Sequence, residues 1–528
     1  MTSSSRREWR LYAGLFLAGL IVYGAASLLI RSPGYMDAEY YFATAKQLAQ
    51  GKGFLEPFLW NYLSDPGGLP APSHTYWMPL ASLLAAASMT VFGDTFRSAQ
   101  VASVLIAAAV PVLAARISLT AGGEKKTAWI AGGLALLPGF YAPYFLTTDT
   151  FALFAVIGGA ALWQMGEAVE RPAAGRWVGI GALIALAHLA RADGLLLWGP
   201  AAYALWASRE RRVRHFGFAF LGYVALMIPW WVRNVEVTGG LFAPGAARAL
   251  WLLDYDELFS FPASQLTAAR WWAAGPATLL AHRLQSGWTN LQTILAVNGY
   301  VLLLPLMILG AWNRRRHPLV RAGGVYAVLL VLFMTLAFPF AGARGGFFHS
   351  SAALMPLLWA LAAFGIDRAA AWIAPRLAWD EGRTRGLLIT VAVLLAAALS
   401  AWTLAGKAGV LGPASSFDRN LTTYRQVGAF VENPDESTVV AVNDPPGFFL
   451  ATGIPAVAIP NGSEDTLQRV AARYGVDWIV LEADHPRELD ELYRNPSARS
   501  WLGPPRVSSD PAGRAVLIFN VVPEKVDD

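Results

Sequence analysis

The sequence has no cysteine and few charged residues. The absence of cysteine excludes disulfides, thiolate metal sites and cysteine nucleophiles. Charged residues make up 15% of the 528 residues, against about 25% in typical soluble domains, whereas hydrophobic residues make up 55%. This composition excludes a soluble globular enzyme, a disordered chain and a fibrous repeat. It indicates an integral membrane protein.

Uncharged runs recur along most of the chain. Most of them reach roughly 17–25 residues, which is enough for a helix to cross the hydrocarbon core. Backbone groups in lipid must be paired within their own segment, so these runs are predicted to be helices. We expect about eleven spans, with the second run lying as a re-entrant or interfacial helix. The runs cover 11–30, 75–93, 98–115, 127–148, 150–166, 177–190, 194–208, 216–232, 284–313, 322–343, 345–366 and 386–406.

The basic residues predict the orientation of these spans. They gather in alternate connecting segments, beginning with Arg6, Arg7 and Arg10 before the first run and recurring at Arg314, Arg315 and Arg316. Basic residues favour the cytoplasmic side. We therefore expect a protein of the plasma membrane with its N-terminus in the cytoplasm and its C-terminus outside. Membrane orientation also accounts for the formal charge of +5, so no nucleic-acid partner is expected.

The predicted organisation is a polytopic α-helical membrane domain over residues 1–412 followed by a small extracytoplasmic α/β domain over 413–528. Two large outward loops cover 31–74 and 233–283. The tail alternates short β-type runs with a helical segment at 464–474, which is typical of an α/β domain. It contains no glycine-rich phosphate loop, and we expect it to act as a lid or docking domain without chemistry of its own.

Three acids stand at predicted membrane surfaces. Asp37 and Glu39 follow the first span directly, at the start of a predicted helix over 37–50, and Asp149 is the only charge between Lys126 and Glu167. Ionisable groups at membrane depth are costly and mark functional sites. The structural alternative is helix capping, because Asp is a good N-cap and acids suit helix starts.

Arginines provide candidate anion sites on the same side. Arg344 lies in a glycine-rich segment, where it could clamp a phosphate in bidentate fashion or instead extend toward lipid headgroups. Arg191 is followed closely by Asp193, which also fits an internal ion pair. Arg233 follows a later span and is a weaker candidate.

Further polar side chains are candidates for contact with a substrate. These are His74 and Tyr40 in the first outward loop and His349 five residues after Arg344. His74 could orient a substrate or bind a metal, although a single histidine is more often hydrogen-bonded within the protein.

The order of these motifs resembles the GT-C superfamily of polytopic glycosyltransferases, in particular the bacterial branch related to protein O-mannosyltransferases and aminoarabinose transferases. The resemblance covers roughly residues 10–370, with a variable tail. Asp-Ala-Glu stands here where many relatives have adjacent Asp and Glu, which leaves the role of Glu39 open. The matching residues are Asp37 and Glu39; Ala45, Leu48, Gly51 and Gly53; Pro79, Leu80, Phe92, Gly93 and Arg97; and Asp149.

The resemblance implies transfer of a sugar from a polyprenyl-phosphate-linked donor to a lipid, glycan or protein acceptor at the membrane. Asp37 would be the general base, with Glu39 and Asp149 positioning the acceptor. Asp37 and Asp149 would bind a divalent cation, Mg²⁺ or Mn²⁺, if one is used. The three arginines would hold the donor phosphate, and His74, Tyr40 and His349 would contact substrate.

The sequence also allows two other classes of membrane protein. A transporter or lipid flippase would explain the charges among the spans as a substrate path. A non-catalytic scaffold would use the membrane helices only to present the C-terminal domain.

Overall fold

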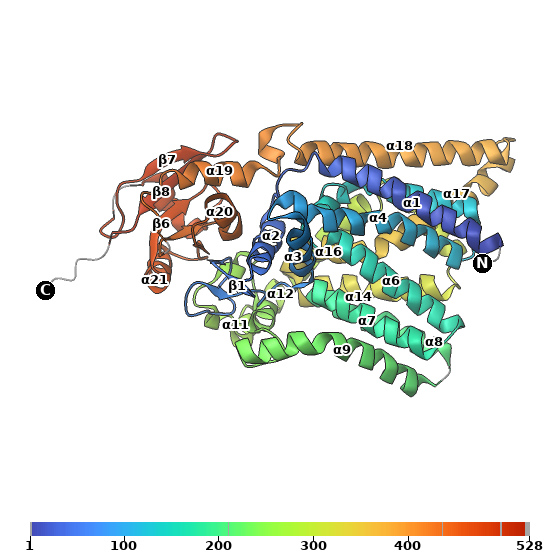
Figure 1. The fold of residues 1–528 in the computed structure, drawn as a ribbon, viewed down its shortest axis with the longest axis horizontal. Helices are drawn as coiled ribbons and strands as arrows, with labels where there is room; N and C mark the ends of the chain where they lie inside the picture. The colour runs from blue at the N-terminus through green and yellow to red at the C-terminus, as the bar shows by residue number, and fades with distance from the viewer. Residues whose placement is uncertain (1–2, 210, 436, 497–498, 523–528) are drawn as a thin grey trace.

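Long apolar helices form a bundle from the N-terminus to about residue 407 (Figure 1). The computed structural model describes residues 3–209, 211–435, 437–496 and 499–522. Among these residues, seven helices are long and apolar enough to cross a membrane, and an eighth span arises if the bent pair Lys125–Ala135 and Gly139–Leu146 counts as one. The seven are Glu8–Ser27 of α1 (Ser3–Ser27), α4 (Phe96–Thr120), α6 (Phe151–Glu170), α9 (Arg212–Thr238), Pro318–Ala337 with α14 (Pro318–Leu332), Pro339–Arg376 with α17 (Met355–Arg376), and α18 (Glu381–Lys407).

The described residues contain seven or eight candidate spans, fewer than the eleven expected, because several apolar runs form short or broken helices. The runs 177–190 and 194–208 become α7 (Ala174–Ala190), whose 17 residues lie at the lower limit for crossing, and α8 (Trp198–Ser208), whose 11 residues lie well below it. Run 284–313 is divided by a π-turn into α12 (Pro276–Thr293) and α13 (Leu304–Asn313). Run 75–93 becomes α3 (Leu80–Phe92), with 13 residues, as suits a helix that does not cross.

Small residues let neighbouring helices approach closely. A Cβ atom built on Gly181 of α7 would lie 1.7 Å from the carbonyl oxygen of Ala219 in α9, and one on Gly310 of α13 would lie 1.9 Å from that of Leu361 in α17. Close backbone approach through small residues is typical of helix packing in membranes, where dispersion contacts provide much of the association.

The C-terminal region contains a six-stranded mixed sheet at the opposite end of the molecule from the N-terminus (Figure 1). The strand order is β2-β5-β4-β6-β8-β7; the pairs from β2 to β6 are parallel, and those from β6 to β7 are antiparallel. The α/β pattern predicted for the tail is therefore confirmed. The elements are β4 (Val439–Val442), β5 (Ala456–Ala458), β6 (Val476–Leu481), β7 (Arg506–Ser509) and β8 (Ala515–Asn520), with α19 (Arg419–Gly428), α20 (Pro445–Thr452), α21 (Glu464–Tyr474) and α22 (Asp490–Arg494).

Both large loops are built onto this sheet. The edge strand β2 (Phe58–Leu59) comes from the first loop and pairs with β5, and the Tyr62 hydroxyl donates a hydrogen bond to the Ala458 carbonyl. In the second loop, Ser260 forms an isolated bridge with Asn461. The loops also contain α2 (Met36–Ala49), the pair β1 (Leu55–Glu56) and β3 (Ala71–Pro72), α10 (Pro244–Arg248) and α11 (Ala268–Ala273).

Candidate active site

Helix α2 carries Asp37 in its first turn and agrees with the helix predicted over 37–50. Alanine, glutamate, lysine, glutamine and leucine in its sequence are good helix formers. The N-cap is Tyr35, which makes no side-chain capping bond. Asp37 is therefore not the capping residue, although its charge suits the N-terminal end of the helix dipole. Its side chain stays 31% exposed.

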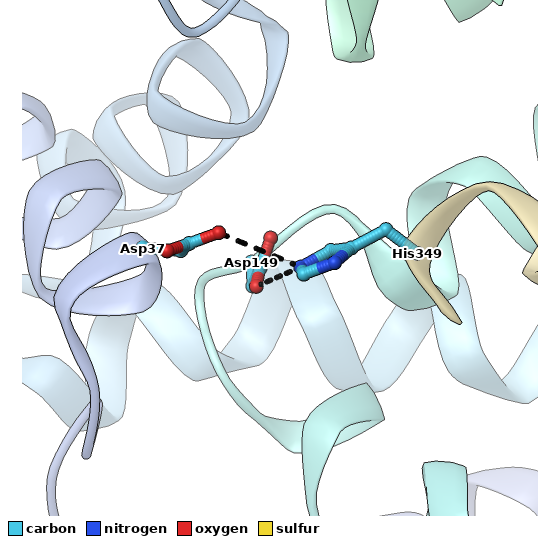
Figure 2. Close-up of side chains that lie close together, drawn as sticks. All are labelled: Asp37, Asp149 and His349. Atoms are coloured by element: carbon cyan, nitrogen blue, oxygen red, sulfur yellow. Dashed lines mark hydrogen bonds and ion pairs between the residues drawn. The ribbon is translucent and has the colours of Figure 1, made fainter. Parts of the chain in front are cut away.

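Three side chains that are distant in sequence meet at one point, as Figure 2 shows. His349 comes from the short helix α16 (Phe347–Ser351), and its Nε2 atom lies 2.9 Å from an Asp149 oxygen and 3.7 Å from an Asp37 oxygen. Asp149 precedes α6, and its side chain is 1% exposed. We call Asp37, Asp149 and His349 the acid–histidine trio.

Hydrogen bonds fix the orientation of the trio. The Tyr35 hydroxyl donates to Asp149 over 2.7 Å, and the backbone N–H of Thr150 donates to the same carboxylate. Nδ1 of His349 lies 2.8 Å from the carbonyl oxygen of Gly345. A carbonyl only accepts, so Nδ1 carries a proton. Nε2 faces two carboxylates, which also only accept, so its contact with Asp149 requires a second proton on the ring or a cation at Nε2.

The two carboxylates of the trio differ in acidity. Burial raises the pKa of Asp37 to about 6, and the charge of Asp149 adds to this effect. Burial also disfavours the charged form of Asp149, but His349 and the bonds from Thr150 and Tyr35 outweigh it and lower the pKa to about 2. At neutral pH both groups are ionised, and Asp37 is the one with basicity suited to proton transfer.

The trio fits a divalent metal ion. Two carboxylate oxygens and one imidazole nitrogen lie within 4.8 Å of one another. The N–H donated by His349 to a backbone carbonyl is the outer contact that metal-binding histidines usually make. The sequence predicted Asp37 and Asp149 as metal ligands and assigned His349 to substrate; the structure brings the histidine to both acids. The donor set is therefore mixed, which suits Zn²⁺ or Mn²⁺ as well as Mg²⁺.

Arg344 stands exposed at a break in the helix that leads to the trio. Gly345 has a φ of +122°, a conformation that residues with a Cβ rarely adopt, and this kink lies within the turn Gly342–Gly346. The guanidinium lies over the ring of Tyr255 at 4.8 Å. No ion pair engages Arg344 within the described residues, so its charge is available to an anion.

Arg191 lies near the trio but is already paired. Its Nε donates to Asp193 over 3.1 Å, and the Ser350 hydroxyl donates to the same carboxylate. The Arg191 side chain is 15% exposed. This geometry matches the internal ion pair that the sequence left open.

Arg233, His74 and Tyr40 of α2 form a separate cluster, in which His74 and Tyr40 are buried and Arg233 is partly buried. The His74 N–H donates to the Tyr40 hydroxyl over 2.6 Å, and the Arg233 guanidinium donates to the Ser73 carbonyl. The His74 ring contacts the hydroxyls of Ser73 and Ser82 at 2.9 and 3.0 Å. None of the three hydrogen-bonds a member of the trio, and their contacts hold the first loop together.

Glu39 points away from the trio toward the C-terminal domain. It is fully buried beside Asp444 at the start of α20, and a Cβ added to Gly447 would lie 2.8 Å from its carboxylate. Burial and the Asp444 charge raise the pKa of Glu39 well above its usual range. The raised pKa favours the protonated form of Glu39, whose side chain joins α2 to the domain.

The sequence reasoning missed several groups around the trio. Tyr35, which bonds Asp149, lies two residues before Asp37, and this proximity was a signal that the sequence offered. Ser350 stands beside His349 in the same way. Tyr255 and Asp444 come from distant segments that only the fold brings near, and no local pattern marked them.

Comparison with known proteins agrees with the fold and with the motifs. The family model of the dolichyl-phosphate-mannose-protein mannosyltransferases matches residues 73–232. No curated protein sequence matches the chain significantly. Residues 73–232 include Asp149, Arg191 and most of the helices that surround the trio.

Solved structures share the fold at low sequence identity. ArnT from Cupriavidus metallidurans, bound to undecaprenyl phosphate, aligns with a TM-score of 0.56 at 14% identity, over 98% of this chain and 100% of that one. The oligosaccharyltransferase AglB from Archaeoglobus fulgidus, with an inhibitory peptide and a dolichol-phosphate, aligns at 0.54 and 13%, over 97% of this chain and 74% of that one. A structure of the A. fulgidus enzyme with Zn and sulfate aligns at 0.57 and 14%, over 95% and 72%.

The transporter and scaffold alternatives do not account for this agreement. The family match lies in the membrane domain, and the shared fold extends over nearly the whole chain. Together with the motif order, they make the chain similar to GT-C membrane glycosyltransferases, through a family match over residues 73–232 and a fold shared with ArnT and AglB.

Proposed function

We propose that the protein transfers a sugar from a polyprenyl-phosphate-linked donor to an acceptor on the outer side of the membrane, with Asp37 as the general base. The observation that carries the proposal is the acid–histidine trio, in which a half-buried carboxylate of raised pKa stands beside a second, ionised acid and a histidine. Structural relatives bound to undecaprenyl phosphate and to dolichol-phosphate support the class of donor.

The reaction is a single displacement at the anomeric carbon. Asp37 accepts the proton of the acceptor hydroxyl or amine while the new bond to carbon forms. The bond from carbon to the phosphate oxygen breaks, its electron pair stays on the phosphate, and the polyprenyl phosphate leaves. The configuration at the anomeric carbon inverts.

Arg344 balances the charge of the leaving phosphate. The guanidinium is exposed, has no ion pair among the described residues, and belongs to the segment that leads into His349, five residues later. Planar guanidinium groups bind phosphate oxygens in pairs. Arg191 and Arg233 are engaged by Asp193 and by the Ser73 carbonyl, and they have supporting roles.

A divalent ion held by Asp37, Asp149 and His349 would supply positive charge beside the phosphate. The structure of the A. fulgidus relative with Zn supports this assignment. The chain's own contribution is the fixed orientation of His349 by Gly345 and of Asp149 by Tyr35 and Thr150.

Purified protein in nanodiscs, supplied with a panel of sugars on undecaprenyl phosphate, tests the proposal. Loss of the lipid-linked sugar is followed by mass spectrometry, with and without a chelator. Wild type should turn over at least one donor, and Asp37→Asn should reduce turnover by at least about 10²-fold. The matched control is Asp94→Asn, an acid 40% exposed on the surface, which should retain activity. Full activity of Asp37→Asn would refute the role of the base.

A further inference from the structure

The helix that carries His349 is short, and the backbone is irregular on both sides of it. Helix α16 is only five residues long. The turn Gly342–Gly346 before it contains two residues with non-helical dihedral angles, and after it the chain tightens into the 3₁₀-turn Ala352–Leu354. Five residues provide little more than one helical turn, which is too short to be stable by itself. The direction of His349 therefore depends on contacts that other segments make with α16.

Tyrosine hydroxyls donate to the backbone carbonyls on both sides of His349. The Tyr141 hydroxyl bonds the Phe348 carbonyl over 3.0 Å, and the Tyr326 hydroxyl bonds the Ser350 carbonyl over 3.1 Å. Both tyrosine side chains are fully buried. Tyr141 belongs to the bent pair of helices and Tyr326 to α14, so the two bonds reach α16 from different parts of the bundle. We call Tyr141 and Tyr326 the tyrosine pair.

Asn298 fixes the direction of the Tyr141 bond. The side-chain nitrogen of Asn298 lies 3.2 Å from the Tyr141 hydroxyl and 3.0 Å from the Ser351 hydroxyl. An amide nitrogen carries two protons and only donates, so each hydroxyl accepts one proton and keeps its own to donate. Both hydroxyl protons are then available to the Phe348 carbonyl, which has two lone pairs and lies 3.1 Å from the Ser351 hydroxyl.

Further contacts hold the imidazole ring itself. The Phe151 ring stacks on the His349 ring, with centroids 3.9 Å apart and planes 20° apart. Phe151 lies two residues after Asp149, so this stack joins the histidine to the segment of its acidic partner. The stack restrains the plane of the ring, the Gly345 carbonyl restrains its rotation, and the tyrosine pair restrains the backbone that carries it.

We propose that Tyr141 and Tyr326 are positioning residues that hold Nε2 of His349 at the two carboxylates of the trio. This inference rests on the proposed function and adds two residues that act only through the backbone of α16. Productive metal and catalytic geometries tolerate displacements of about 0.5 Å. When either hydroxyl is removed, a buried carbonyl beside His349 loses a partner, and the short helix loses one of the bonds that set its direction.

The bundle offers a matched control for a purely structural role. The hydroxyl of Tyr23, a residue of α1 that is 2% exposed, donates to the Ala135 carbonyl over 2.5 Å. Tyr23→Phe therefore removes the same kind of buried tyrosine–carbonyl bond from the same membrane domain. Its bond lies on α1 rather than on the helix that carries His349, so it should affect stability alone.

The test is calorimetric titration of Zn²⁺ into chelator-treated, full-length protein in nanodiscs, together with turnover of lipid-linked sugar and Tm. Tyr141→Phe and Tyr326→Phe should each weaken Zn²⁺ binding about tenfold, as does the loss of an outer contact of a metal ligand. Their turnover should fall at limiting Zn²⁺ and recover as Zn²⁺ is raised. Tyr23→Phe should bind Zn²⁺ as wild type does, whatever its Tm.

A lower Tm of Tyr141→Phe and Tyr326→Phe with unchanged Zn²⁺ affinity and turnover overturns the inference, as does an equal loss of affinity in Tyr23→Phe. If wild type binds Zn²⁺ but turns over no donor, the proposed function falls, and the affinities still decide the inference. If wild type turns over donor without binding Zn²⁺, the proposed function stands. The inference then holds only if turnover falls in both variants of the tyrosine pair and not in Tyr23→Phe.

Discussion

His349 Nε2 lies 2.9 Å from a carboxylate oxygen of Asp149, although 200 residues separate them in the chain. The proton on Nδ1 is held by the Gly345 carbonyl, so Nε2 offers its lone pair to the space between the two acids. A cation or a proton there satisfies all three groups. Four measurements follow from this relationship and from the surroundings of the trio.

Removal of His349 should weaken metal binding. His349→Gln and Asp149→Asn each delete one of the three ligands, and the loss of affinity for Zn²⁺ or Mn²⁺ should exceed the roughly 10–100-fold caused by losing an outer partner. Calorimetric titration of chelator-treated protein measures this loss. His317→Gln, at a histidine 4.0 Å from Glu170 and away from the trio, is the control. Unchanged affinity in His349→Gln would rule out the trio as the metal site.

Glu39→Gln should keep activity within about twofold of wild type. Glu39 is buried beside Asp444 and its raised pKa favours the neutral form, which an uncharged amide reproduces. Turnover of the lipid-linked sugar is measured in parallel for Glu39→Gln and Asp37→Asn. The comparison distinguishes the roles of the two acids in the motif. Equal inactivation of both variants would show that Glu39 takes part in the chemistry.

Arg344→Gln should raise the KM for the donor about tenfold or more, because it removes a charged partner of the phosphate. Thermal stability should not change, since the exposed guanidinium packs over the Tyr255 ring and makes no hydrogen bond or ion pair within the described residues. Arg494→Gln, at a surface arginine with a 73% exposed side chain, controls for loss of one positive charge. A lower Tm with an unchanged KM for the donor in Arg344→Gln would show that Arg344 has a structural role instead.

Stability should fall as pH rises because of Glu56. Burial raises its pKa from 4.5 to about 8, opposed by Tyr40 and Arg233. The folded state therefore binds the proton more tightly than the unfolded state, and this stability is complete below about pH 4.5 and lost as pH rises toward 8. Tm measured from pH 5 to 8 should fall less in Glu56→Gln than in wild type. Glu488→Gln, an exposed acid, should follow wild type, and parallel profiles for all three proteins would contradict the assignment.

The sequence predicted the elements with strong local signals. The helix beginning at Asp37 and the α/β pattern of the tail follow from capping, composition and alternation, and the structure has both. Asp149 stood out because a lone charge in a long apolar stretch is costly. These signals are local, and each can be recognised within about 15 residues of sequence.

The number of membrane spans and the set of residues that meet at the site could not be predicted from local signals. An apolar run does not reveal where a π-turn or a 3₁₀ turn breaks it, and 194–208 became an 11-residue helix for that reason. Glu39, two residues from Asp37, faces a different domain, because adjacent positions on a helix point in different directions. His349 meets Asp149 only through the packing of helices whose contacts no local pattern encodes.

The first loop contributes strand β2 to the C-terminal sheet, and this pairing has a consequence for biosynthesis. Tyr62 of that loop bonds Ala458, 396 residues later in the chain. During synthesis, the segment that follows Asp37 remains without its partner strand until β5 has been translated. Closing so long a loop is slow. Completion of the catalytic end is thereby tied to arrival of the last part of the chain, and a prematurely terminated chain lacks the sheet on which its first loop folds.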